Sequence, residues 1–345
     1  MTELKGSIND HGSDKIQYVF SHDIIKLSND TIFLNSKNRF IRWIFQLNYL
    51  IYKQLLLPLK LLCIKPDYLI CVDFVAPFFS FNTKKITVIH DSLFWDYPEN
   101  YGFLWCKYFI SLVNLGINKE TQIITTSRYS KNRLSKIIKS TNKINYVYQT
   151  FRNFKGKDVS LSVPEKYILH IGSFEERKDL MTLLKAFRLL KNKNLKLVLA
   201  GSKVLNGNKK VLKKVNQYIH KYELYDKVIL PGFISQGEAN VYYKNALIYV
   251  FPSLDEGFGI PILEALSFSI PTICSDTEVF KEIGSNSVEF FKAGDPNSLA
   301  KKMAFLIRSK KTRAKLVTNG LEHIKKFSRK NFITGFEQYI LNEKK

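Results

Sequence analysis

Two glutamates, Glu256 and Glu264, lie eight residues apart around a glycine-containing loop. The loop follows an apolar run typical of a buried strand, and Pro261 predicts the first turn of a helix after it. N–H groups at the start of such a helix attract an anion, and the loop glycines Gly257 and Gly259 let the backbone approach it. Carboxylates repel phosphate but accept hydrogen bonds from hydroxyl groups. Together these features indicate a site for a ligand that joins phosphate to hydroxyl-rich groups, such as a sugar nucleotide.

The full string EGFGIPILEA at residues 256–265, with a strand before it and a strand ending in Ser275-Asp276 after it, resembles the Glu-x7-Glu signature of the retaining glycosyltransferases of family four. The resemblance covers roughly residues 65–343. It implies an α/β fold of the GT-B kind, in which two doubly wound Rossmann-like domains face a cleft. It also implies transfer of a hexose from a nucleotide diphosphate sugar to an acceptor hydroxyl, with retention at the anomeric carbon.

The same resemblance assigns roles to individual residues. Glu264 is expected to hold the nucleotide ribose and Glu256 the donor sugar. Arg177 and Lys178, in the loop GSFEERKDL after a strand at residues 167–171, are expected to hold the diphosphate, Arg through a fork of donors and Lys as a point charge. The expected donor-binding set is Gly172, Arg177, Lys178, Gly257, Phe258, Gly259, Ile260 and Glu264.

A histidine and an aspartate, His90 and Asp91, follow a β-branched run at residues 86–89. In open α/β sheets ligands bind beyond the carboxyl ends of the strands, where this pair would lie. Relatives in the family commonly have His-Asp at this point. His90, Asp91 and Glu256 are therefore the expected catalytic residues, with His90 near the reacting carbon of the donor sugar. A histidine that only ends a strand is the alternative.

The length of 345 residues and the alternation of strand and helix patterns predict two domains. We expect an acceptor-side domain at residues 1–155, a nucleotide-sugar domain at residues 156–327, and a final helix at residues 328–345 that packs back on the first domain. No glycine occurs between Gly12 and Gly102, so the glycine-bearing loop that opens related chains is missing. The first domain is therefore expected to be shortened at its start.

The net charge of +23 is spread over both halves of the chain and favours anionic partners. The charge does not distinguish between three anionic partners, namely a phosphate-bearing substrate, an anionic membrane and nucleic acid. No nucleic-acid-binding module is recognised in the sequence. A basic helix expected at residues 127–140 suits an anionic membrane or is simply a solvated face. The apolar helix expected at residues 41–62 contains Lys53 and Lys60, which argues against a membrane span. Residues 127–140 and 40–62 are the two candidate segments for contact with an anionic membrane surface. The expected location is the cytoplasm, peripheral on the inner face of the membrane.

Four scattered cysteines, Cys63, Cys71, Cys106 and Cys274, show no metal or redox spacing and are expected to be reduced core thiols. No Asp-x-Asp occurs, so the expected reaction needs no metal and no cofactor beyond the nucleotide sugar. A glycan or lipid-linked acceptor in surface polysaccharide synthesis is the expected second partner, and mannose is one candidate hexose. A sugar-nucleotide epimerase or phosphorylase of the same fold and an inactive scaffold remain alternatives.

Overall fold

The computed structural model describes residues 16–19, 39–138, 143–152, 159–201 and 210–342. The chain divides into two compact units. Unit 1 comprises Met1–Tyr148 with Phe332–Lys345, and unit 2 comprises Gln149–Asn331. The change from the first unit to the second thus lies at residue 148, slightly before the position expected from the sequence.

Unit 1 contains a parallel sheet in the simple order β1-β2-β3-β4. Its strands are β1 (Tyr68–Cys71), β2 (Lys84–Val88), β3 (Gln122–Thr125) and β4 (Ile144–Tyr146). Between them lie α6 (Leu93–Asp96), the 3-10 turn η2 (Pro98–Asn100), α7 (Phe103–Gly116) and α8 (Arg128–Ile137). Apolar side chains of β2 and β3 meet Phe336 and Ile340 of the final helix α16 (Arg329–Asn342), so this helix packs in unit 1.

A long helix precedes the sheet of unit 1. It consists of α4 (Arg39–Ile51), a π-helical stretch η1 (Tyr52–Leu56) and α5 (Leu57–Ile64), which confirms the helix expected at residues 41–62. Lys65, in the left-handed conformation, ends it. By length and composition alone, residues Trp43–Ile64 pass as a membrane span, in contrast to the sequence expectation. One face of the helix, however, carries polar side chains that form hydrogen bonds with the rest of unit 1.

Unit 2 contains a six-stranded parallel sheet in the order β10-β9-β8-β5-β6-β7. The strands are β5 (Tyr167–Ile171), β6 (Lys196–Ala200), β7 (Val228–Gly232), β8 (Ile248–Phe251), β9 (Thr272–Ser275) and β10 (Glu289–Phe291). The chain runs outward from β5 to β7, returns to the other side of β5 with β8, and runs outward again to β10. This is the Rossmann order with its reversal between β5 and β8.

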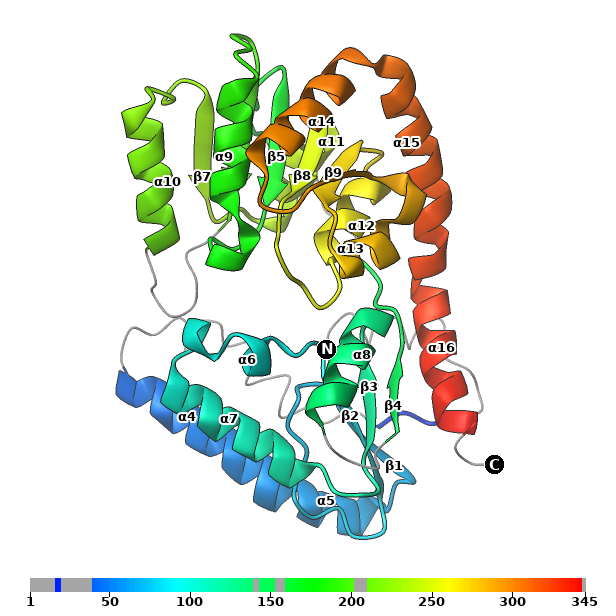
Figure 1. Cartoon of the computed structure of the whole chain (residues 1–345). Helices are drawn as coiled ribbons and strands as arrows, with labels where there is room; N and C mark the ends of the chain where they lie inside the picture. The colour runs from blue at the N-terminus through cyan, green and yellow to red at the C-terminus, as the bar shows by residue number, and fades with distance from the viewer. Residues whose placement is uncertain (1–15, 20–38, 139–142, 153–158, 202–209, 343–345) are drawn as a thin grey trace. The chain divides into compact units, whose positions relative to one another are not determined.

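Helices cover both faces of the second sheet (Figure 1). They are α9 (Leu180–Leu189), α10 (Lys210–Lys221), α11 (Gln236–Asn245), α12 (Ile260–Ser267), α13 (Glu278–Gly284), α14 (Pro296–Arg308) and α15 (Lys310–His323), with 3-10 turns η3 (Glu176–Lys178), η4 (Ser285–Ser287) and η5 (Ile324–Phe327). Because both faces are covered, β8 and β9 are buried along their whole length. The two parallel sheets with interleaved helices confirm the predicted α/β class.

Local signals in the sequence place several helix starts in unit 2. The side chain of Asp179 accepts a hydrogen bond from the Thr182 N–H at the start of α9. Ser235 and Glu238 form the predicted capping box of α11. One expectation about side-chain burial is wrong: Cys63 is exposed, because it lies on the outer face of α5, while the other three cysteines are buried.

Candidate donor site in unit 2

The candidate site lies where the carboxyl ends of β5 and β8 meet. These strands are hydrogen-bonded neighbours in parallel, so the loops that follow them leave the sheet at the same edge. The Leu254 N–H donates a 2.7 Å hydrogen bond to the Arg177 carbonyl oxygen, which ties the two loops together. Ligands of open α/β sheets bind at this reversal of strand order.

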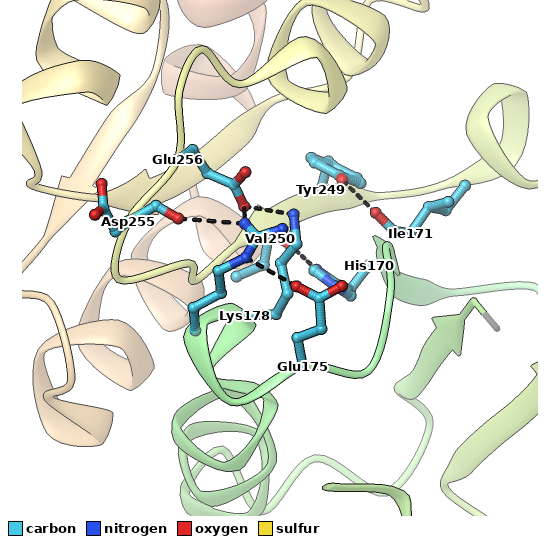
Figure 2. A network of polar contacts seen from close by, with 9 residues as sticks. His170, Ile171, Glu175, Lys178, Tyr249, Val250, Asp255 and Glu256 are labelled. Atoms are coloured by element: carbon cyan, nitrogen blue, oxygen red, sulfur yellow. Dashed lines mark hydrogen bonds and ion pairs between the residues drawn. The ribbon is translucent and has the colours of Figure 1, made fainter. Parts of the chain in front are cut away.

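Two cations from the β5 loop meet one carboxylate from the β8 loop (Figure 2). The Arg177 guanidinium lies 2.7 Å from a Glu256 oxygen, and the Lys178 ammonium is ion-paired with the same oxygen. Arg177 also contacts Glu175 at 2.8 Å, and the Lys178 ammonium lies 4.9 Å from the centre of the Phe251 ring. Only 9% of the Lys178 side chain is exposed, so the cluster holds its charges largely out of water.

The electrostatics of this cluster favour an ionised Glu256. Burial by itself raises the pKa of Glu256, but the charges and hydrogen bonds of Lys178 and Arg177 outweigh burial and lower it. Glu256 and Glu175 together balance the two cations, which lie largely out of water. An incoming diphosphate would share these cations with the two carboxylates.

His170 of β5 lies beneath the cluster. Its Nδ1 is 2.9 Å from the Val250 carbonyl oxygen, and its ring stacks at 6.0 Å on the Phe251 ring. Burial lowers the pKa of His170 to about 4, although the hydrogen bond to Val250 acts in the opposite direction. The ring is therefore neutral at pH 7, so it adds no third cation to the site.

The second glutamate of the motif, Glu264, is completely buried in α12. Arg152 binds both of its oxygens, with nitrogen–oxygen distances of 2.6 and 3.3 Å. The Tyr243 hydroxyl donates a third hydrogen bond at 3.1 Å. The motif predicts that this carboxylate receives hydrogen bonds from ligand hydroxyl groups; in this structure it receives them from a guanidinium and a phenol.

The start of α12 has the backbone geometry that the motif predicts. Gly259 has φ +111°, and a Cβ there would lie 3.3 Å from the Phe280 ring. Both the conformation and the close packing favour glycine at this position. Pro261 occupies the first turn, and no side chain caps the helix start at Gly259. Pro261 has no N–H, and the Ile262 N–H donates to the Gly259 carbonyl oxygen at 3.0 Å, so an anion at this end would be favoured mainly by the helix dipole.

The other predicted donor-binding residues follow the same two strands. Gly172 directly follows β5, and its N–H donates to the Ala200 carbonyl oxygen at 3.0 Å. Gly257 and Phe258 are buried, with the Phe258 ring against Phe327, and Ile260 begins α12. The structure thus brings the predicted donor-binding residues of unit 2 to one end of one sheet.

His90 and Asp91 lie in unit 1 at the carboxyl end of β2. His90 Nε2 is 2.9 Å from the Val72 carbonyl oxygen, and because a carbonyl oxygen only accepts, the Nε2–H donates this hydrogen bond. Thr126 donates a 2.8 Å hydrogen bond to the His90 carbonyl oxygen, and Asp91 accepts one from the Leu93 N–H at 3.0 Å. The half-buried ring is held in place by these contacts and by Phe74, 5.4 Å away. Each unit has its own site residues, and the predicted pairing of His90 with Glu256 stays a prediction.

Three residues of the site, Arg152, Tyr243 and His170, are not predicted by the sequence patterns. None lies in the motif strings, and Arg152 precedes β5 in a stretch without a helix or strand pattern. One sequence signal could have identified Tyr243: in the run YYKNALIYVF, an aromatic pair at residues 242–243 precedes the apolar run of a buried strand. Among the described residues no group of three or more His, Cys, Asp or Glu side chains is arranged to hold a metal ion.

Comparison with known proteins identifies the family that unit 2 matches. Residues 152–323 match the family model of glycosyl transferases group 1. The O-antigen chain mannosyltransferase RfbU of Salmonella typhimurium is 26% identical over 216 residues, which is 62% of this chain and 58% of that protein. The O-antigen chain mannosyltransferase B of Escherichia coli is 23% identical over 271 residues, covering 73% of this chain and 68% of that protein.

The fold is shared with solved structures as well. A glycosyltransferase from Rickettsia africae superimposes with a TM-score of 0.66 at 17% identity, covering 89% of this chain and 82% of that chain. Two units with parallel sheets and interleaved helices, the second in the Rossmann order with a charged cluster at its strand reversal, define a protein of the GT-B fold class. The chain belongs to the glycosyl transferases group 1 family.

Proposed function

We propose that the chain is a retaining, metal-independent glycosyltransferase that moves a hexose from a nucleotide diphosphate sugar to a glycan or lipid-linked acceptor in surface polysaccharide synthesis. The observation that carries this proposal is the buried cluster of Arg177, Lys178 and Glu256 at the reversal between β5 and β8. The cluster holds two cations that can bind phosphate oxygens, next to a carboxylate for sugar hydroxyls.

The cations of the cluster would act mainly on the leaving group. When the bond from the anomeric carbon to the diphosphate oxygen breaks, negative charge grows on the nucleotide diphosphate. Arg177 and Lys178 are already held by Glu175, Glu256 and the Phe251 ring, so they need little rearrangement to stabilise that charge. The positive end of the α12 dipole adds to the same effect.

The two motif glutamates take the hydroxyl-bearing ends of the donor. Glu264 receives hydrogen bonds from the ribose, with Arg152 and Tyr243 orienting its oxygens. A carboxylate has about four lone-pair sites, and three are used by these partners. One site remains, whereas the two ribose hydroxyls need two, so nucleotide binding requires Arg152 to release part of its contact with Glu264. Glu256 contacts the donor sugar, and His90 and Asp91 of unit 1 are the other expected catalytic residues.

The sequence relatives favour mannose as the hexose and O-antigen-like glycans as products, since two of them are named O-antigen chain mannosyltransferases. The chain spans 58% of the length of RfbU, so mannose as the hexose and a glycan as the acceptor are proposals for this chain. A lipid-linked acceptor would place the enzyme in the cytoplasm, peripheral on the inner face of the membrane.

The proposal is tested with purified protein and a panel of GDP-, UDP- and ADP-sugars. Thermal shift identifies the donor, a transfer assay with a lipid-linked oligosaccharide identifies the product, and NMR reads its anomeric configuration. We expect one nucleotide class to stabilise the protein, a product with the donor's configuration, and full activity in a chelator. An epimerised nucleotide sugar or a free sugar phosphate would establish the epimerase or phosphorylase instead. No stabilisation by any donor would indicate an inactive scaffold.

A further inference from the structure

Exposed large apolar side chains are concentrated on two helical segments of unit 1. Most of those among the described residues fall between Trp43 and Leu115. We call the following set the apolar face: Trp43, Ile44, Leu47, Ile51, Leu55, Leu56, Leu59, Leu62 and Ile64 of α4–α5, and Phe103, Leu104, Trp105, Tyr108 and Leu115 of α7. An exposed apolar surface of this extent marks an interaction site rather than ordinary scatter.

The long helix has two opposite faces. Positions 47, 51, 55 and 59 are exposed and follow one another at intervals of four, which places them on one stripe. Leu57 and Leu61, two positions on from the exposed Leu55 and Leu59, are buried against unit 1. The stripe is apolar although it faces outward, so the folded unit itself does not explain its composition.

Helix α7 extends the same face. Tyr49 of α4 and Phe109 of α7 pack on one core cluster of unit 1, and Figure 1 shows α4 and α7 running alongside each other. Leu104 and Leu115 of α7 are 81% and 63% exposed. Trp105 adds a partly exposed indole, the kind of side chain that prefers the boundary between lipid and water.

Polar contacts hold the long helix on the protein. The buried Lys53 ammonium lies 2.8 Å from an Asp73 oxygen and donates to the Val75 carbonyl oxygen at 3.1 Å. The Tyr49 hydroxyl donates to Asp73 at 2.7 Å. Crossing a bilayer would break these contacts and place Lys53 in hydrocarbon, which is costly. The helix is therefore built to lie along a surface.

The charge around the apolar face fits an anionic surface. Neither helix contains an acidic residue, and exposed Lys60, Lys65 and Lys107 lie on or next to them. By contrast, the basic helix α8 uses part of its charge internally, since Arg133 pairs with Asp96 and Lys131 with Asn145. Lys139, which belongs to the basic helix expected at residues 127–140, lies outside the described residues.

We propose that the apolar face binds the surface of an anionic membrane, with its leucines and tryptophans inserted at the headgroup boundary and its lysines among the headgroups. This goes beyond the proposed transfer reaction, because it assigns a lipid surface to unit 1 whatever the donor or acceptor is. Of the two candidate segments predicted from the sequence, residues 127–140 and 40–62, it selects the second, and it adds α7.

The first test is flotation of the full chain with vesicles of phosphatidylcholine alone or with phosphatidylglycerol. We expect binding to anionic vesicles that persists in part at high salt, because apolar insertion is not screened. Leu55→Gln with Leu59→Gln should weaken partitioning at least about tenfold, from the apolar area returned to water. Leu189→Gln with Leu321→Gln, at similarly exposed positions of unit 2, is the matched control and should bind like wild type.

The second test reads insertion directly. The chain has three tryptophans, and Trp43 and Trp105 lie on the apolar face. Vesicle binding should shift their fluorescence to shorter wavelength, and Trp43→Phe with Trp105→Phe should abolish the shift while flotation persists in part. Failure to bind either vesicle, or equal loss in the control pair, would overturn the proposal. The proposal would also be overturned if the chain does not bind vesicles but self-associates, and if Leu55→Gln with Leu59→Gln abolishes that self-association. Nucleotide binding, measured in the same variants, reports separately on the donor site.

Discussion

At the carboxyl end of β5, Lys178 is held between the Glu256 carboxylate and the Phe251 ring. A buried ammonium is costly unless it is paired, so the cluster of Lys178, Arg177 and Glu256 must stand together. Glu256 and Glu175 balance the two cations, and a diphosphate would share them. Phosphate recognition is thus expected to dominate the contribution of these two cations to binding.

Replacing both Arg177 and Lys178 by alanine should therefore distinguish ligands with and without phosphate. Affinity for a nucleoside diphosphate should fall at least about tenfold, since each charged hydrogen bond contributes about 1.5–3 kcal/mol. Affinity for the nucleoside should change little. Isothermal titration of both ligands measures the difference, and Lys210→Ala with Lys214→Ala, which removes exposed cations paired with Glu176, is the control. Equal losses for both ligands would refute the phosphate role.

Glu264→Ala tests the ribose assignment. The substitution should weaken nucleotide and nucleoside binding alike, by about 1.5–3 kcal/mol, because the ribose is common to both. Glu289→Ala, which removes another ion-paired glutamate of unit 2, should leave affinity unchanged. The assignment fails if a folded Glu264→Ala protein binds the nucleoside as tightly as wild type.

His170 predicts a pH dependence of stability. Its pKa is about 4 in the folded chain and about 6.5 when unfolded, so the unfolded state binds the proton more tightly. Stability from this group is complete above pH 6.5 and is lost as the pH falls toward 4, by up to about 3 kcal/mol. In urea titrations at several pH values, His170→Gln should lose less stability over this window than wild type. Parallel curves for the two proteins would contradict the prediction.

At the scale of elements, the ends of β5 and β6 come unusually close. A Cβ at Gly201 would lie 1.7 Å from the Gly172 carbonyl oxygen, and Gly201 has φ +154°. Only a residue without a side chain lets these ends meet, and Gly172 leads directly into the loop that carries Arg177. The spacing of β5 and β6 therefore positions the phosphate-binding loop.

Gly201→Ala should destabilise unit 2 and weaken donor binding together, because the β5 loop must shift. Gly232→Ala is a matched control, since Gly232 has φ +77° but a Cβ added there would meet nothing within 4 Å among the described residues. The control should cost only the conformational strain of about 1–2 kcal/mol. Thermal unfolding and nucleotide titration of both variants measure the two effects. A Gly201→Ala protein no less stable than the control would disprove the close approach.

At the scale of the whole molecule, the chain leaves unit 1 after residue 148 and returns to it with α16. Phe336 and Ile340 of α16 are each 3% exposed and pack against β2 and β3. Unit 1 therefore depends on residues from both ends of the chain, while unit 2 is continuous in sequence.

Phe336→Ala should lower the free energy of unfolding of unit 1 by about 3–5 kcal/mol, the usual cost of removing a buried phenylalanine. Unit 2 should be little affected, so only one part of a calorimetric unfolding trace should move to lower temperature. Nucleotide, which binds unit 2, identifies the other part by shifting it upward. Gln338→Ala on the exposed side of α16 is the control. If the whole trace moves uniformly, the two units do not unfold independently.

The sequence by itself determined several helices and strands and the order in which the candidate site residues occur along them. Strand β5 begins and ends where its apolar run does, and the caps at Asp179 and Ser235 set the starts of α9 and α11. These features depend on neighbours within a few residues, which a linear pattern records. The motif from Glu256 to Glu264 predicted the donor-site loop and helix for the same reason.

Only the tertiary structure decided which side chains meet. Arg152 binds Glu264 across 112 positions, and Lys178 binds Glu256 across 78. From the sequence, the apolar run at residues 43–64 is equally consistent with a core helix, a membrane span and a surface helix. Its exposed stripe is defined by the contact between Lys53 and Asp73, because that contact fixes which side of the helix faces the unit. Such pairings depend on how strands and helices are brought together in space, which local patterns do not encode.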